Sequence, residues 1–202
     1  MKRSFVIIIT FLLLCADARA QGGELLFWGI PFGSSKADLI TAIKACSPDA
    51  IVVDERLGGN TLTWRAKGFP DEHLHFEGFE VYSAAAEFAP DDKLTGAYVG
   101  LIPESGKKVF ELYSSVKSYL TVRYGKPESD YAFFKSPYHQ EGGQNNVWAI
   151  IEGKCVFTAF WTVYHHNNPI TISIDITSDQ HVELSFVNEQ ARTEASVLQK
   201  EE

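Results

Sequence analysis

The sequence has little cysteine, little methionine and a deficit of basic residues. Of its 202 residues, three are cysteine and one is methionine, and 18 lysines and arginines stand against 26 aspartates and glutamates, which gives a net charge of −8. A chain this acidic is poorly suited to binding the phosphate backbone of nucleic acids. We therefore expect no nucleic-acid partner.

Long apolar runs are also missing, except for one at the N-terminus. Residues 5–14 are almost wholly apolar, follow two basic residues and precede the small residues Ala18 and Ala20. This pattern is typical of a secretory signal peptide, and the run is too short to span a bilayer. We expect signal-peptide cleavage after Ala20, export of residues 21–202 to the bacterial periplasm, and no transmembrane segment in the exported chain.

Cys15 raises the alternative of a lipoprotein signal, in which a cysteine is acylated. That signal requires a small residue before the cysteine, and here the residue is Leu14. We therefore favour simple cleavage, with Gln21 as the first residue of the exported chain, and keep acylation of Cys15 as the alternative.

Cleavage would leave two cysteines, Cys46 and Cys155. Because exported proteins fold in an oxidising compartment, such a pair is commonly joined. We expect a Cys46–Cys155 disulfide. The alternative is two reduced cysteines that act as small buried hydrophobic residues.

Hydrophobic periodicity predicts an α+β fold with two helices. Ser35 and Asp38 have the spacing of a capping box at the start of a helix that ends before Ser47. A wider apolar stripe predicts a second helix from Ser105, as N-cap, to Tyr124. Alternating or apolar runs predict strands at 51–53, 61–66, 73–77, 79–88, 94–101, 131–134, 147–152, 155–164, 170–176 and 182–186.

A helix followed by about four strands occurs twice in this order. The sequence therefore predicts two tandem helix-plus-antiparallel-strand repeats, at 21–102 and 103–188, and a polar tail at 189–202. Their helices would pack on one face of a continuous, mostly antiparallel sheet. The other face of that sheet would be open to solvent.

The segment Gly29–Ser35, which reads Gly-Ile-Pro-Phe-Gly-Ser-Ser before a helix, resembles the opening of many exported bacterial proteins. The layout is similar to the β-lactamase-inhibitor-protein-like group, which includes a small outer-membrane assembly lipoprotein family. Members of these families bind other proteins through sheet surfaces or loops. The resemblance implies this fold, export and a protein-binding role, and it carries over no functional residue.

The motifs of known enzymes are incomplete. Ser105 with Lys108, and Ser114 with Lys117, match the Ser-x-x-Lys motif of penicillin-recognising enzymes. The accompanying Ser-Asp-Asn and Lys-Thr-Gly motifs do not occur in the sequence. The sequence therefore favours a protein without catalytic activity and without a cofactor.

His73, His75 and Glu77 are the best candidates for metal ligands. Alternation along a strand would place the three side chains on one face. A solvated polar face opposite Leu74 and Phe76 explains the same spacing, so we expect no tight metal binding. A periplasmic enzyme or metal-binding protein that uses these three residues is the alternative function.

The strand at 155–164 is apolar on both faces, as expected of a covered strand. If its odd-numbered residues meet the helices, the opposite face carries aromatic side chains beside polar residues of the next two strands. These residues are Phe160, Tyr164, Asp175, His181 and Glu183. Aromatic anchors among polar groups are typical of recognition surfaces.

The sequence therefore predicts an interaction module that binds a protein or peptide on this face. Two alternatives remain open. The same face could be a second hydrophobic layer covered by the tail or a loop, and the protein could be a small-molecule carrier with a pocket between helices and sheet.

Overall fold

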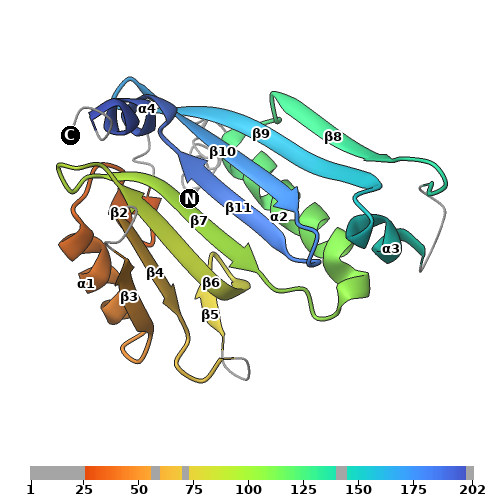
Figure 1. The fold of residues 1–202 in the computed structure, drawn as a ribbon, viewed down its shortest axis with the longest axis horizontal. Coiled ribbons are helices and arrows are strands. Elements are labelled where there is room, and N and C mark those ends of the chain that lie inside the picture. Colours follow the sequence, from red (N-terminus) through yellow and green to blue (C-terminus); the bar gives the residue numbers. More distant parts are fainter. Residues whose placement is uncertain (1–25, 56–59, 70–72, 140–144, 199–202) are drawn as a thin grey trace, which may run out of the picture.

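The computed structural model describes residues 26–55, 60–69, 73–139 and 145–198. It shows an α+β fold dominated by one antiparallel sheet, as predicted (Figure 1). The helices are α1 (Lys36–Cys46), α2 (Val109–Tyr124), α3 (Asn145–Ile151) and α4 (Glu189–Leu198). The strands are β1 (Leu26–Phe27), β2 (Ile30–Pro31), β3 (Ile51–Glu55), β4 (Thr61–Arg65), β5 (Leu74–Phe76), β6 (Phe79–Phe88), β7 (Leu94–Leu101), β8 (Ser129–Phe134), β9 (Cys155–His165), β10 (Asn168–Ile176) and β11 (Val182–Val187).

The main sheet has nine strands in the order β3-β4-β6-β7-β11-β10-β9-β8, with β5 beside β6. Every pair is antiparallel. The strands before α2 run from the β3 edge to the centre, and those after α2 run from the β8 edge to the centre, where β7 pairs with β11. Two separate tandem repeats are not evident, because the two halves differ: β5 lies beside β6 outside the main strand order in the first half, and α3 interrupts the strands of the second half.

One face of the sheet carries the hydrophobic core. Alternate residues of its strands are buried there, as period-2 patterning requires. In β10, for example, Ile170, Ile172 and Ile174 are fully buried. The helices α1 and α2 and the β1–β2 hairpin supply the other half of the core through Leu39, Ile43, Val109, Tyr113, Val116, Leu120, Phe27 and Trp28.

The two long helices begin differently. The Ser35 hydroxyl accepts a hydrogen bond from the Asp38 amide, and the Asp38 carboxylate accepts one from the Ser35 amide, so the predicted capping box is confirmed. Ser105, the predicted cap of the second helix, makes no side-chain capping hydrogen bond. A 3-10 turn at Gly106–Lys108 lies between Ser105 and α2 instead.

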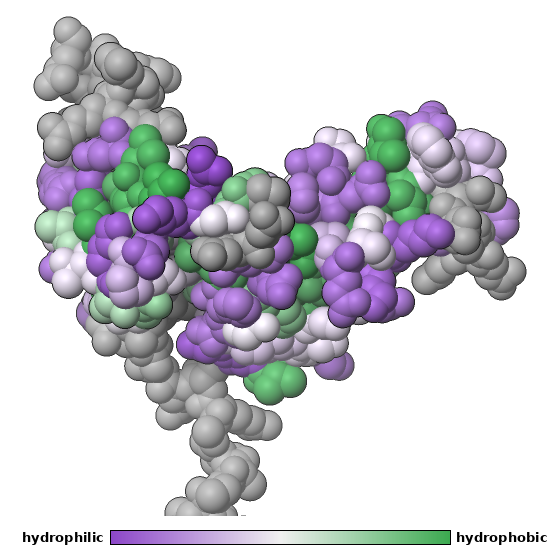
Figure 2. All heavy atoms as spheres, turned by 90° about the horizontal axis from the view of Figure 1, so that it is seen from below, coloured by the Kyte–Doolittle hydropathy of each residue, from purple (hydrophilic) through white to green (hydrophobic). Residues whose placement is uncertain are grey.

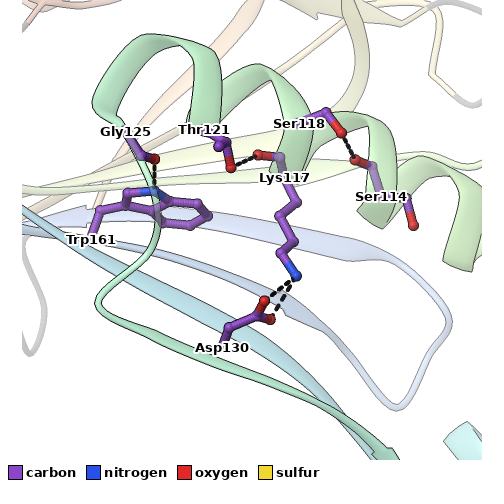
Figure 3. Close-up of polar contacts among 7 residues, drawn as sticks. All are labelled: Ser114, Lys117, Ser118, Thr121, Gly125, Asp130 and Trp161. Atoms are coloured by element: carbon purple, nitrogen blue, oxygen red, sulfur yellow. Dashed lines mark hydrogen bonds and ion pairs between the residues drawn. The ribbon is translucent and has the colours of Figure 1, made fainter.

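Side-chain contacts fix α2 on the sheet (Figure 3). The Trp161 indole Nε1–H in β9 donates to the carbonyl of Gly125, just beyond the end of α2, at 2.9 Å. The Lys117 ammonium donates to both oxygens of Asp130 in β8, at 2.6 and 2.5 Å. These contacts join α2 to β8 and β9, which follow it in the sequence.

The strand predicted at 147–152 is wrong, because this segment forms α3. Ala149 and Ile150 are both buried although they are adjacent, and Trp148 is 59 % exposed. A strand would place adjacent residues on opposite faces, whereas a helix can turn both toward the core. The helix ends where Gly153, with a φ of +65°, donates its amide to the Ile150 carbonyl.

The tail predicted at 189–202 is helical over the described part, in α4. Asn188 caps this helix, because its side-chain oxygen accepts the amide hydrogen of Ala191 at 3.0 Å. The helix contacts β7 and β10, and Arg192 lies 3.4 Å from the Glu87 carboxylate in β6. Glu87 belongs to the sheet face opposite the core, so α4 covers one end of that face.

The expected Cys46–Cys155 disulfide is contradicted, because both cysteines are free. Cys46 ends α1 beside the β3 edge, whereas Cys155 begins β9, next to the β8 edge (Figure 1). The two thiols therefore lie in opposite halves of the sheet, far beyond the reach of a disulfide bond.

No helix of the described residues is long and apolar enough to cross a membrane. The predicted signal peptide, its cleavage point after Ala20 and the alternative acylation of Cys15 lie outside the described residues.

Candidate functional site

The sheet face opposite α1 and α2, here called the open face, gathers exposed apolar side chains. Among the described residues, eight large hydrophobic side chains are exposed, and five of them lie on this face. Ile51 and Val53 belong to β3, Tyr131 and Phe133 to β8, and Tyr164 to β9. They therefore occupy the two sides of the open face rather than its centre.

Figure 2 shows the molecule from below, with a notch between the part that carries α1 and β3 and the part that carries α3. The notch lies on the side of the sheet away from α2, which is the open face. A partner bound in this hollow could contact the β3 side and the β8–β9 side of the open face at once.

The predicted aromatic residues Phe160 and Tyr164 both lie on the open face, as expected. Tyr164 pairs with Pro169 near the β9–β10 turn and is 72 % exposed. Phe160 pairs with Ser173, is half-buried and lies nearer the middle of the sheet.

The predicted polar residues Asp175, His181 and Glu183 lie together at the opposite end of the open face. Asp175 pairs directly with Glu183 across β10 and β11, and His181 precedes β11. Asp175 follows Pro169 by six positions along β10, which corresponds to about 20 Å along the strand. The five predicted residues thus share one face but form two groups, with Phe160 between Tyr164 and the acidic group.

The acidic group carries unfavourable negative charge. Neighbouring protein atoms partly remove the Glu183 carboxyl from water, which raises its pKa above the usual value, and the charges of Asp175 and Asp179 add to the rise. Hydrogen bonds from Thr177 and His181 lower the pKa of Asp179 and keep it ionised. The group can therefore stabilise a cation or a hydrogen-bond donor that approaches it.

Tyr82, which the sequence analysis did not single out, lies beside this acidic group. Tyr82 is the extra residue of a β-bulge in β6, and its ring packs against the His181 ring in a tilted arrangement, with 4.5 Å between centroids. The ring lies over Gly100, where a Cβ atom would come within 2.2 Å of it. His181 also contacts the Asp179 carboxylate through Nδ1 at 3.2 Å.

The other end of the open face is closed by α4. Burial raises the pKa of Tyr98 in β7 to about 12, and the nearby Glu87 carboxylate adds to the increase. Glu87 also contacts Arg192 of α4. The helix α4 therefore covers this end, where Val187 is buried, whereas Tyr164 remains exposed.

The candidate metal ligands do not share one strand face. His75 is exposed in β5 and His73 lies 3.5 Å from Glu80, but Glu77 has a φ of +51° in the β5–β6 turn and contacts Arg123. The alternation that would align all three ends before Glu77. Within the described ranges, no group of three His, Cys, Asp or Glu side chains could hold a metal ion.

A pocket of about 440 Å³ lies at the α4 end of the sheet. Its lining includes Phe32, Leu94, His165, Asn168 and Asn188, from turns and strand ends of both sheet halves. It does not lie between the helices and the sheet, where a carrier pocket was expected. It is also at the far end of the sheet from the acidic group.

Sequence reasoning missed several residues of the open face, among them Ile51, Val53, Tyr82, Tyr131 and Phe133. A bulge cannot be recognised from alternation, so Tyr82 had no signal in the sequence. Tyr131 and Phe133 alternate with Ala132, and this pattern could have placed both on one face of the predicted strand.

Comparison of the chain with protein-family models, with curated proteins and with solved structures returns no significant match. The resemblance to the β-lactamase-inhibitor-protein-like group therefore stays a prediction.

Proposed function

We propose that the protein is an exported, non-enzymatic interaction module that recognises a protein or peptide through the open face. The observation that carries the proposal is the gathering of exposed aromatic and aliphatic side chains on the one large sheet face that α1 and α2 leave uncovered. Binding surfaces of this type depend on a few aromatic anchors surrounded by polar groups.

We further propose a partner segment that carries lysine or arginine. Asp175, Asp179 and Glu183 are close together, and the pKa of Glu183 is raised first by partial burial of its carboxyl and then by repulsion from Asp175 and Asp179. A cationic side chain would relieve this repulsion, while Phe160 and Tyr164 would contact its apolar neighbours. Such a complex weakens as ionic strength rises, because salt screens the attraction between charges.

Two further observations support export and the presence of two tandem repeats. The N-terminal sequence pattern supports export to the periplasm. The mirrored strand order, in which each half contributes a helix and then strands from an outer edge to the centre, supports two tandem repeats at 21–102 and 103–188.

A photo-crosslinking experiment in bacterial cells that export the protein to the periplasm tests the proposal. A photoreactive phenylalanine analogue at Tyr164 should capture a defined species, whereas the same analogue at Val122, which is 90 % exposed on α2, should not capture it. Capture of the same species from both positions, or from neither, would contradict recognition through the open face.

The pocket at the α4 end supports a second candidate, a carrier of a small molecule. Its volume is within the range of small-ligand sites, and its lining combines apolar side chains with His165 and two asparagines. Replacement of Ala191, which lines the pocket, by Trp should abolish ligand binding while leaving capture at Tyr164 intact.

A further inference from the structure

The outer edge of β8 is an exposed strand edge without a neighbour among the described residues. β8 is the terminal strand of the main sheet and pairs only with β9. Its four central residues, from Asp130 to Phe133, are all exposed. Natural proteins usually blunt such edges with lysine, proline or a bulge. Ser129–Phe134 contains no lysine or proline, and its register with β9 is regular.

The backbone groups that face outward follow from the register. Lys135, just after β8, donates its amide to the carbonyl of Lys154, just before β9, and the regular register therefore turns the amides and carbonyls of the odd-numbered residues of β8 toward β9. The alternation ends before Ser129, because the Glu128 amide also donates to β9, to the Phe160 carbonyl. Because direction alternates along a strand, Asp130, Ala132 and Phe134 turn theirs outward. These three residues offer three amides and three carbonyls to a further strand.

We propose that β8 pairs with β8 of a second copy of this chain, antiparallel, about a two-fold axis at Ala132. In this register Ala132 faces Ala132 of the other copy, and Asp130 faces Phe134, so all outward amides and carbonyls are used. Tyr131 faces Phe133 on the open face, and the two-fold axis forms this aromatic pair twice. The exposed side chains of β8 are thus complementary to themselves.

Charge also favours this register. It places Lys135 of each copy opposite Ser129 and beside Glu128 of the other copy, so two pairs of opposite charge flank the junction. Asp130 is already compensated by Lys117 of its own chain.

Sedimentation analysis of the purified chain over a range of concentrations tests the proposal. We expect a weak, reversible dimer. Ala132→Pro should weaken dimerisation at least tenfold, because it removes an outward amide without removing a hydrogen bond to β9. Phe133→Lys should have a similar effect, whereas Val122→Lys on α2 should leave the dimer unchanged. The circular dichroism spectrum of each variant should match that of the parent.

The register has its own test in a background in which Cys46 and Cys155, both free thiols, are replaced by serine. Tyr131 and Phe133 of opposite copies would form a non-hydrogen-bonded pair with Cα atoms about 4.5 Å apart, which permits a disulfide. Oxidation of a mixture of Tyr131→Cys and Phe133→Cys chains should therefore cross-link them more efficiently than either chain alone. A parent chain that stays monomeric, a dimer that persists in Ala132→Pro, or equal cross-linking of the single variants would overturn the proposal.

Discussion

At the scale of single residues, Gly100 is required because the Tyr82 ring occupies the space of a side chain. We predict that Gly100→Ala lowers the free energy of unfolding by about 1–3 kcal/mol, since the ring must leave its position against His181. Chemical denaturation measures the loss.

The control for this prediction is the same substitution in a Tyr82→Ala background. Without the ring, a Cβ atom at position 100 has room, and the cost of Gly100→Ala should nearly vanish. An equal cost in both backgrounds would mean that the glycine is required for another reason.

Glu183 gives a pH-dependent prediction. Its pKa is raised in the folded protein, so the ionised carboxylate destabilises the fold; this penalty is absent below the ordinary glutamate pKa and grows as pH rises through the folded value. Glu183→Gln should therefore raise the melting temperature by about 1–2 °C at pH 7 and leave it unchanged near pH 4.

Thermal melts of parent and variant across this pH range measure the difference. Glu111→Gln, at an exposed position of α2, controls for the loss of one negative charge. A gain at pH 7 that is equal in both variants would show that net charge, rather than the position of Glu183, is responsible.

At the scale of elements, the indole of Trp161 holds the end of α2 on β9. Trp161→Phe removes the donor to the Gly125 carbonyl and part of a buried side chain, and we predict a loss of about 1–3 kcal/mol in unfolding free energy. Amide hydrogen exchange at 121–125 should also accelerate. Trp148→Phe, at an exposed site, should change stability by less than about 0.5 kcal/mol.

Elements with a regular period were predictable from the sequence, and elements decided by distant contacts were not. The strands predicted at 170–176 and 182–186 lie within β10 and β11, because a buried face imposes alternation such as that of Ile170, Ile172 and Ile174. The segment 147–152 contains residues that favour strands, yet burial of Ala149 and Ile150 against a core assembled from elsewhere makes it helical. Glu77 lies in a turn for a local reason instead, since Gly78, with a φ of +87°, allows a tight hairpin.

The candidate site, too, was predictable only where it depends on alternation along a strand. The face on which Phe160, Tyr164, Asp175 and Glu183 lie follows from alternation alone. Their separation into two groups does not, because it depends on the register between strands. The cover provided by α4 depends on the contact between Arg192 and Glu87, residues that are far apart in the sequence.

At the scale of the whole molecule, the sheet separates two roles. One face, with α1, α2 and the β1–β2 hairpin, holds the core and the stability of the protein. The other face carries aromatic side chains at its sides, carboxylates at one end and α4 at the other, and it can change without loss of the core. Tyr164 belongs to this second face and contributes little to folding.

The most direct test of this account is the affinity of the Tyr164→Ala variant for the species that the photoreactive analogue captures at position 164. We predict a dissociation constant at least tenfold higher than that of the parent, which is about 1.4 kcal/mol, with a melting temperature unchanged within about 1 °C. Val122→Ala should bind as the parent does. An unchanged affinity for Tyr164→Ala, or an equal loss for Val122→Ala, would contradict the account.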